Sequence, residues 1–278
     1  MTTSAIRVCI AGVSGWAGSE VARAVLDSPQ FVLTGAIARK VAGRDVGEVL
    51  GRVRKGIAVS STIDEALRMS TDVLIDFTEP TTVKQRTLSS LDKGVRVVIG
   101  TSGLTADDYS VIEAKAVSSG LGVIACGNFS ITAALAKRFS LIAAEYLPSR
   151  EILDYAGTDK IDAPSGTTRE IAEEMARISP NELGLPLKDT LGKAEARGAS
   201  IAGTQVHSLR LPSYMISFET IFGLPDERLT IRHDAGTGAK PYVNGTLLAV
   251  RSVLRITGLV RGMDRLLFSA DGHGGCKR

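Results

Sequence analysis

The chain has 278 residues, a length that fits two compact domains. Of these residues, 44% are hydrophobic and 23% charged, which is enough apolar material to fill the core of each domain. The formal net charge of +3 is spread along the sequence without a lysine or arginine block, and only 5% of residues are aromatic, so the composition argues against nucleic-acid and membrane-surface partners. Cys9, Cys126 and Cys276 form no CxxC pair, the three histidines are scattered, and no apolar run approaches the roughly 18 residues that span a bilayer, so we expect a cytoplasmic protein without a metal site.

Short apolar runs alternate with helical patterns over the first 127 residues. Runs such as 6–11 (IRVCIA) and 72–77 (DVLIDF) are apolar almost throughout, as expected of strands that are buried on both faces. The predicted strands are 6–11, 31–38, 72–77, 95–99 and 121–125, and the predicted helices are 18–27, 64–69, a segment after Pro80, and 106–118. This alternation predicts a parallel sheet with helices on both faces.

The pattern changes after residue 128, where strands begin to follow one another directly. The predicted elements are helix 131–146, strand 151–155, amphipathic helix 167–178 with Ile171, Met175 and Ile178 on one face, strands 204–211, 214–222 and 228–233, and helix 247–256. We therefore predict an α/β fold: a Rossmann parallel-sheet domain over 1–127 with 244–278, and an α+β domain with a mixed or antiparallel sheet over 128–243. The glycine-rich tail 271–278 is predicted to be disordered.

A glycine-rich turn follows the first predicted strand and opens the first helix. Its sequence, GVSGWAG, has the spacing GxxGxxG, a variant of the dinucleotide-binding loop. Glycines at these places permit a tight turn, a close approach of the backbone to a pyrophosphate, and close packing of the helix, whose first N–H groups face the phosphates. The residues assigned to this site are Gly12, Ser14, Gly15, Trp16, Ala17 and Gly18. A glycine-rich turn of some other α/β protein is the alternative.

The second predicted strand ends at Arg39 and Lys40, where an NAD-specific site usually carries an acidic residue for the ribose 2′-hydroxyl. Two cations instead suit a 2′-phosphate, because each charge-assisted hydrogen bond contributes about 1.5–3 kcal/mol. We therefore predict a preference for NADPH, with NADH also possible. The alternative is that both are solvated surface cations.

Further cofactor contacts are expected at the carboxyl ends of the later strands, where ligands bind in open parallel sheets. Small, hydroxyl and amide residues gather at each of these ends. The residues predicted to border the nicotinamide and its ribose are Phe77, Thr78, Gly100, Thr101, Ser102, Gly127, Asn128 and Phe129.

The segment KIDAPSGT at 160–167 has the features of an anion site. Thr167 and Glu170 match a capping box, which predicts that a helix begins there with unpaired N–H groups. Gly166 lets a ligand approach the backbone, and Lys160 adds a positive charge and an acidic proton.

Taken together, these motifs resemble the dihydrodipicolinate reductase (4-hydroxy-tetrahydrodipicolinate reductase) family over nearly the whole chain. The resemblance rests on GVSGWAG at 12–18, DFTEP at 76–80, GTSG at 100–103, GNFS at 127–130, KIDAPSGT at 160–167 and HSLRL at 207–211. It implies a two-domain homotetramer that reduces a cyclic unsaturated imine dicarboxylate with NADH or NADPH in lysine and diaminopimelate biosynthesis. It also implies that Lys160 supports protonation and charge, and that Ser165, Gly166 and Thr167 hold a substrate carboxylate.

One departure from the family pattern lies just before Lys160. Family members usually carry a His-His pair there, the first histidine acting as an acid or polarising the substrate, whereas this chain has Ala156 and Gly157. An acid catalyst contributes about 10²- to 10⁴-fold to a rate. We expect its loss to slow the family reaction unless Lys160, Asp159, Tyr155 or water supplies the proton.

Three alternatives follow from this departure and from the glycine turn. In the first alternative, the chain is a reductase of a different cyclic imine. In the second, it is a weakly active or non-catalytic member of the family that binds NADPH. The opening GVSGWAG also resembles acyl-phosphate and semialdehyde dehydrogenases, which need a cysteine nucleophile, and Cys126 is the candidate for that role.

Overall fold

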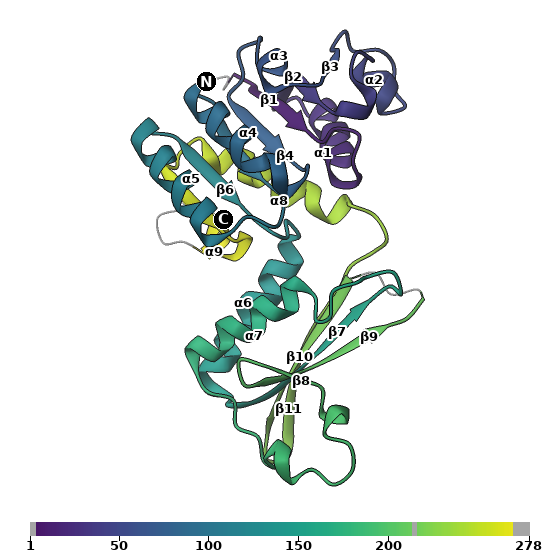
Figure 1. Ribbon diagram of the computed structural model, residues 1–278, viewed down its shortest axis with the longest axis vertical. Coiled ribbons are helices and arrows are strands. Elements are labelled where there is room, and N and C mark those ends of the chain that lie inside the picture. The colour runs from purple at the N-terminus through teal and green to yellow at the C-terminus, as the bar shows by residue number, and fades with distance from the viewer. Residues whose placement is uncertain (1–3, 213–215, 269–278) are drawn as a thin grey trace. The chain divides into compact units, whose positions relative to one another are not determined.

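The computed structural model describes residues 4–212 and 216–268, and these fold into two compact units (Figure 1). One comprises the residues up to Ile131 and from Gly238 onward, and we call it the parallel-sheet unit. The other, Thr132–Thr237, is the mixed-sheet unit.

The parallel-sheet unit contains seven strands in the order β12-β6-β5-β4-β1-β2-β3, and every neighbouring pair is parallel. The strands are β1 (Ile6–Ala11), β2 (Phe31–Ile37), β3 (Val59–Ser60), β4 (Val73–Asp76), β5 (Arg96–Ile99), β6 (Gly122–Ala125) and β12 (Gly258–Arg261). The predicted α/β class and parallel sheet are confirmed. Strands β3 and β12 were not predicted, because neither has a clear apolar run.

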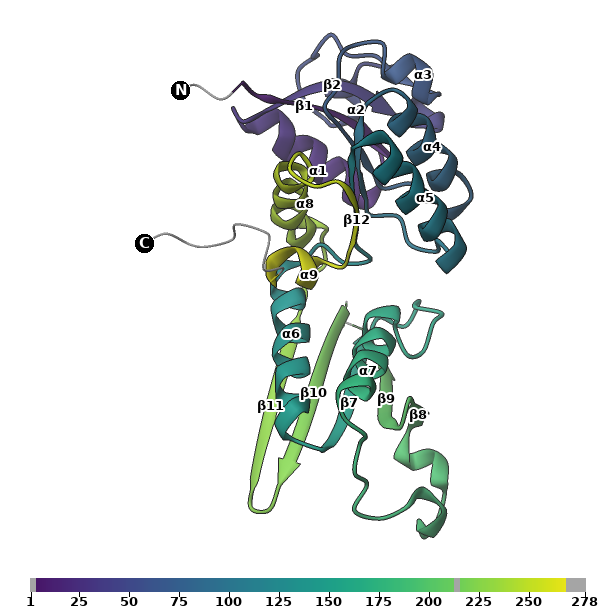
Figure 2. The same ribbon diagram turned by 90° about the vertical axis from the view of Figure 1, so that its left-hand side faces the viewer.

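Helices cover both faces of this sheet (Figure 2). On one face lie α3 (Ile63–Ala66), α4 (Pro80–Asp92) and α5 (Ala106–Ser119), and on the other lie α1 (Trp16–Asp27) and α8 (Lys240–Val253). Two further short helices, α2 (Val46–Val49) and α9 (Met263–Phe268), complete the unit.

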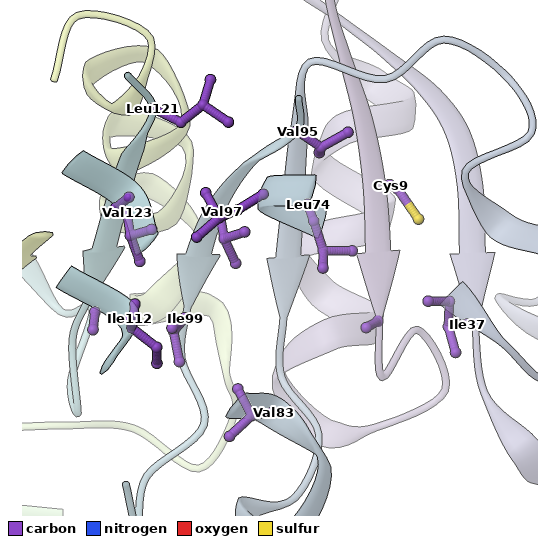
Figure 3. Packing of buried hydrophobic residues seen from close by; sticks show 14 of the residues in the cluster. Cys9, Ile37, Leu74, Val83, Val95, Val97, Ile99, Ile112, Leu121 and Val123 are labelled. Atoms are coloured by element: carbon purple, nitrogen blue, oxygen red, sulfur yellow. The ribbon is translucent and has the colours of Figure 1, made fainter. Parts of the chain in front are cut away.

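Alternate residues of the strands pack against the two helical layers. Leu74, Val97 and Val123 pack with Val83 of α4 and Ile112 of α5 in one cluster (Figure 3). The residues between them along the strands are also fully buried, which explains why these strands are apolar almost throughout.

The mixed-sheet unit has five strands in the order β11-β10-β7-β9-β8. They are β7 (Ser149–Ala156), β8 (Ala199–Ile201), β9 (Thr204–Arg210), β10 (Ile216–Leu224) and β11 (Glu227–Asp234). β7 and β9 are parallel and the other pairs are antiparallel, so the predicted mixed sheet is confirmed.

Helices α6 (Ile131–Tyr146) and α7 (Gly166–Ile178) pack on one face of the mixed sheet. The core there joins Ile152 and Phe218 of the sheet with Ile171 and Met175 of α7. Ile178 was predicted on the same buried face but is 40% exposed, because it is the last residue of the helix.

Two helix starts differ from the predictions. α8 begins at Lys240 rather than 247, since Pro241 is tolerated in the first helical turn. α7 begins one residue early, and its N-cap is Ser165 rather than Thr167; the Ser165 side chain accepts a hydrogen bond from the N–H of Thr168. The predicted tail 271–278 and the start of the predicted strand 214–222 lie outside the described residues.

Candidate functional site

The glycine turn after β1 is packed too closely for side chains. Gly12 has φ +86°, and a Cβ there would lie 2.0 Å from the carbonyl oxygen of Phe77. A Cβ on Gly18 would lie 2.1 Å from the carbonyl oxygen of Gly12. The turn therefore lies directly against the end of β4, and α1 begins directly against the turn.

The N-terminus of α1 is free of competing side chains. Its N-cap is Gly15, which offers no side-chain cap, and its first turn carries no acidic residue. Ser14 and Trp16 are exposed, whereas Ala17 and Gly18 are buried against the sheet. The first N–H groups of a helix lack intrahelical partners, so this end fits a pyrophosphate group.

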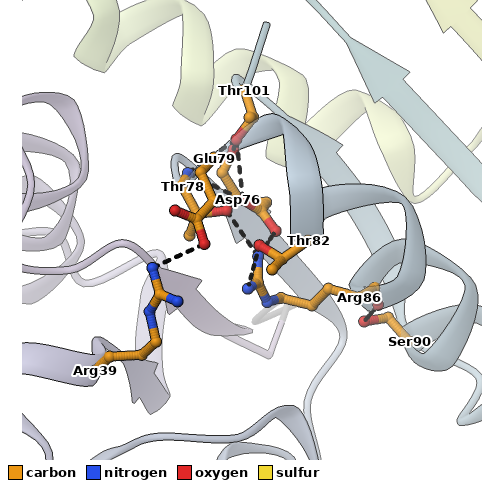
Figure 4. A network of polar contacts seen from close by, with 8 residues as sticks. All are labelled: Arg39, Asp76, Thr78, Glu79, Thr82, Arg86, Ser90 and Thr101. Carbon is orange, nitrogen blue, oxygen red and sulfur yellow. Dashed lines mark hydrogen bonds and ion pairs between the residues drawn. The ribbon is translucent and has the colours of Figure 1, made fainter. Parts of the chain in front are cut away.

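A buried carboxylate organises the ends of β4 and β5 (Figure 4). Asp76 is fully buried and forms an ion pair with Arg86 of α4 at 2.6 Å. Its carboxylate also accepts hydrogen bonds from the hydroxyls of Thr78 (2.6 Å) and Thr101 (3.0 Å). The backbone N–H of Thr78 donates to the hydroxyl of Thr101 at 2.8 Å, so the two predicted cofactor residues are held together.

The remaining predicted cofactor residues in the parallel-sheet unit follow β4, β5 and β6. Phe77 packs over Gly100, where a Cβ would lie 2.0 Å from its ring, and meets the ring of Phe129 edge-on at 5.7 Å between centroids. The side chain of Asn128 accepts a hydrogen bond from the N–H of Ser130 at 2.8 Å. Ser102 and Gly127 are exposed, and nothing lies within 4 Å of a Cβ placed on Gly127.

Arg39 and Lys40 lie in a short 3-10 helix, η1 (Arg39–Val41), which follows β2, and both are exposed. The guanidinium of Arg39 forms an ion pair with Glu79, with Nη2 and Oε1 2.8 Å apart (Figure 4). This partner was not predicted, although Glu79 belongs to the DFTEP motif.

A second buried carboxylate organises the KIDAPSGT loop in the mixed-sheet unit. The side chain of Asp154, on β7, is 1% exposed and pairs with Arg210 of β9 at 2.8 Å. Asp154 also accepts hydrogen bonds from the N–H of Ser165 (2.9 Å) and the hydroxyls of Thr168 (3.1 Å) and Ser208 (3.1 Å). Burial alone would raise the pKa of Asp154, but hydrogen bonds from Arg210 and Ser165 outweigh it and lower the pKa.

Arg210 holds the other end of the same loop, since its Nη2 donates to the carbonyl oxygen of Asp162 at 2.7 Å. Lys160 forms an ion pair with Asp162 at 2.6 Å, and this hydrogen bond lowers the pKa of the Asp162 carboxyl. The loop is therefore fixed at both ends to one buried Asp–Arg pair.

The predicted carboxylate-binding residues lie at the start of α7. Ser165 is buried, Gly166 is exposed with open space around it, and Thr167 is partly buried. The capping box predicted between Thr167 and Glu170 is wrong: Ser165 caps the helix, and the Glu170 side chain instead accepts a hydrogen bond from Lys137 at 2.8 Å. The first turn of α7 carries no acidic residue, which keeps it favourable for an anion.

The positions of the missing histidines lie at the end of β7. Ala156 is fully buried, and Gly157 is partly exposed. The hydroxyl of Tyr155 donates to Glu219 at 3.2 Å, on the opposite side of the strand from Asp154. Tyr155 therefore faces away from the Ser165 side of β7, which argues against it as the proton donor.

The two cysteines among the described residues, Cys9 and Cys126, do not fit a nucleophilic role. Cys126 is 3% exposed, and burial raises the pKa of the Cys9 thiol to about 12. A reactive cysteine needs an accessible thiolate, so the structure gives no support to the acyl-phosphate dehydrogenase alternative. Among the described residues, no group of three His, Cys, Asp or Glu side chains is placed to hold a metal ion.

Sequence reasoning missed the residues beneath the candidate ligand loops. Asp154 carried a signal, because it alternates with Ile152 on the buried side of an apolar strand, where a carboxylate needs a partner. Arg210 belongs to the HSLRL motif, and it is largely buried in an ion pair with Asp154. Nothing in the sequence identified Arg86 as the partner of Asp76.

Comparisons with known proteins cover almost the whole chain. A family model described as dihydrodipicolinate reductase, N-terminus, matches residues 6–129, and one described as dihydrodipicolinate reductase, C-terminus, matches residues 129–267. A 4-hydroxy-tetrahydrodipicolinate reductase of Desulfitobacterium hafniense is 36% identical over 94% of this chain and 98% of its own length. One from Moorella thermoacetica is 33% identical with the same coverage.

Solved structures agree with the sequence matches. A dipicolinate-bound dihydrodipicolinate reductase from Paenisporosarcina sp. TG-14 aligns with a TM-score of 0.83 and 30% identity, covering 95% of this chain and all of that one. An amine dehydrogenase from Mycobacterium smegmatis, with a TM-score of 0.65 and 18% identity over 94% of this chain and 95% of its own, shares the fold. Within the described residues, no helix has both the length and the apolar character required to cross a membrane.

Proposed function

Because the chain belongs to the dihydrodipicolinate reductase family, we propose that it reduces a cyclic unsaturated imine dicarboxylate with a nicotinamide dinucleotide. The observation that supports this proposal is the KIDAPSGT loop, in which Ser165 is fixed to Asp154 while Gly166 has open space around it. The resemblance found in the sequence and the two-part fold are both confirmed.

The dinucleotide is proposed to bind at the glycine turn of the parallel-sheet unit. The uncapped N-terminus of α1 would hold the pyrophosphate, and the Thr78 and Thr101 ends of β4 and β5 would border the nicotinamide ribose. Exposed Arg39 and Lys40 support a preference for NADPH over NADH. When bound, the reduced cofactor supplies a hydride.

The substrate carboxylate is proposed to bind at the start of α7. Ser165, Gly166 and Thr167 would hold it there, where the helix dipole favours a negative charge. Lys160 would hold a proton at Nζ and supply it to the reduced ring. The carboxylate of Asp162, 2.6 Å from Lys160 Nζ, orients the Lys160 side chain.

A related cyclic imine is a second candidate substrate, and Ala156 favours it. The methyl side chain of Ala156 is fully buried and has no proton to donate, so the usual position lacks a proton donor. An imine that needs less polarisation by an acid could be reduced with Lys160 or water as the proton donor.

We also propose that the chain forms a cytoplasmic homotetramer through the open face of the mixed sheet. Leu153, Glu219 and Ile221 lie on this face, opposite the helix-packed residues, and all three are partly exposed. Light scattering after size exclusion is expected to give a mass four times that of one chain, and Ile221→Glu should lower it. A monomeric wild-type protein would contradict this assembly.

The test of the enzymatic proposal is a steady-state assay with 4-hydroxy-tetrahydrodipicolinate and with related cyclic imines, run separately with NADPH and NADH. We expect substrate-dependent oxidation of the dinucleotide, with the higher kcat/KM for NADPH. If the protein binds the dinucleotide but none of the cyclic imines supports its oxidation, the proposal is overturned in favour of a non-catalytic member.

A further inference from the structure

The ion pair between Arg39 and Glu79 joins two loops at the proposed dinucleotide site. We infer that Glu79 determines cofactor specificity: it occupies Arg39 and places a negative charge beside it, which weakens binding of the 2′-phosphate of NADPH. This inference rests on the proposed binding of a dinucleotide at the glycine turn, and it limits the NADPH preference that Arg39 and Lys40 by themselves imply.

The sheet order brings these two residues together. Arg39 follows β2 and Glu79 follows β4, and these strands flank β1 on either side. The glycine turn after β1 packs against Phe77, only two residues before Glu79. The ion pair, 2.8 Å long, therefore connects the loops on the two sides of the turn that would hold the pyrophosphate.

The position of the Glu79 carboxylate is set by its surroundings. Glu79 is the N-cap residue of α4, yet its side chain makes no cap hydrogen bond and binds Arg39 instead. The dipole of this 13-residue helix favours a negative charge at that end. The preceding residue, Thr78, is anchored to buried Asp76, so the backbone that presents Glu79 is fixed.

The two dinucleotides differ at the atom that would meet this pair. NADPH carries a 2′-phosphate, which must displace Glu79 from Arg39 or share the guanidinium with a like charge. NADH carries a 2′-hydroxyl, which can donate a hydrogen bond to a carboxylate, as it does to the acidic residue of NAD-specific sites. Glu79 therefore opposes NADPH and tolerates NADH, while exposed Lys40 still attracts the phosphate.

The experiment measures dissociation constants of NADPH and NADH by fluorescence titration of the purified protein. Glu79→Gln keeps the side-chain shape and removes the charge. We expect this substitution to lower the dissociation constant of NADPH about threefold to tenfold, as removal of one exposed like charge would. The dissociation constant of NADH should stay the same or rise. The gain should shrink at high salt, because both charges are solvent-accessible.

Asp92→Asn is the matched control. It removes an exposed carboxylate that pairs with Lys115 at the other end of the same helix, about 20 Å from Glu79 at 1.5 Å per residue. An NADPH-to-NADH affinity ratio that is the same in wild type and Glu79→Gln, or that Asp92→Asn shifts equally, overturns the inference. Failure of the wild type to bind either dinucleotide instead overturns the proposed function on which it rests.

Discussion

Each of the two candidate ligand loops is held by a buried Asp–Arg ion pair, but the groups beside the two pairs differ. In the parallel-sheet unit, buried Asp76 pairs with Arg86 and fixes the ends of β4 and β5. In the mixed-sheet unit, buried Asp154 pairs with Arg210 and fixes the loop at 160–167. Each carboxylate satisfies several donors, which is the condition under which a buried charge is tolerated.

The difference lies in what stands beside each pair. The glycine turn of the parallel-sheet unit keeps an uncapped helix end and close packing that only glycine permits. At the end of β7, Ala156 and Gly157 replace the histidine pair that the family resemblance leads one to expect. The framework proposed to bind the substrate is retained although the usual acid is absent, so we predict that binding and proton donation are separable in this chain.

Replacement of Lys160 is expected to have the largest effect. With no histidine at 156 or 157, Lys160→Ala should lower kcat/KM by about 10²- to 10⁴-fold, the usual contribution of an acid catalyst. The dissociation constant for NADPH should not change. Lys193→Ala, which removes an exposed lysine from another loop of the same unit, is the control. Retained turnover in Lys160→Ala would assign the proton to water.

Neutralising each of the two buried carboxylates in turn should affect a different ligand. Asp154→Asn leaves Arg210 without its partner and should cost about 3–5 kcal/mol of unfolding free energy. In protein that remains folded, Asp154→Asn should raise the KM for the imine without weakening the binding of NADPH. Asp76→Asn should do the reverse, because Asp76 anchors Thr78 and Thr101. Equal effects of both variants on both ligands would contradict the comparison.

The acid stability of the protein should report on Asp154. Its pKa is lowered in the folded state, so the stability it contributes is present above the ordinary carboxyl pKa of about 3.9 and is lost as the pH falls through the lower folded-state value. Denaturant unfolding between pH 7 and pH 3 should therefore show the difference between wild type and Asp154→Asn shrinking below pH ~4. A difference that stays constant over this range would show that Asp154 does not act through its charge.

The smallest effect is expected for Cys126→Ser. Cys126 is buried, so the folded variant should keep full reductase activity per active site, measured as dinucleotide oxidation. Complete loss of turnover in a variant whose thermal unfolding is unchanged would return the acyl-phosphate dehydrogenase alternative to consideration.

The parallel sheet could largely be predicted from the sequence, because its strands are continuous apolar runs and Gly12 and Gly18 lie where packing excludes a Cβ. Strand β1 and helix α6 begin and end where they were predicted. Strand β12 was missed because Gly258 and Arg261 leave it only two apolar residues, which is no clear apolar run.

Partners of charged side chains could not be predicted in the same way. Arg39 was identified as a cation suited to a phosphate, but its ion pair with Glu79 depends on strand order, which places two distant segments together. The cap of α7 was assigned to Thr167 because the sequence fits a capping box there, whereas Ser165 is the residue tied to buried Asp154. Local pattern identified these regions, and tertiary contacts decided which residue acts in each.

Hydride transfer to a cyclic imine is the reaction proposed for this chain, and an isotope-transfer experiment measures it directly. Purified protein would be incubated with the imine dicarboxylate and NADPH deuterated at nicotinamide C4, and the product analysed by mass spectrometry. We predict one deuterium in the reduced ring from one stereoisomer of the labelled cofactor, and label transfer that is about 10²- to 10⁴-fold slower with Lys160→Ala under the same conditions. Tight binding of NADPH with no deuterium in any ring product would contradict it.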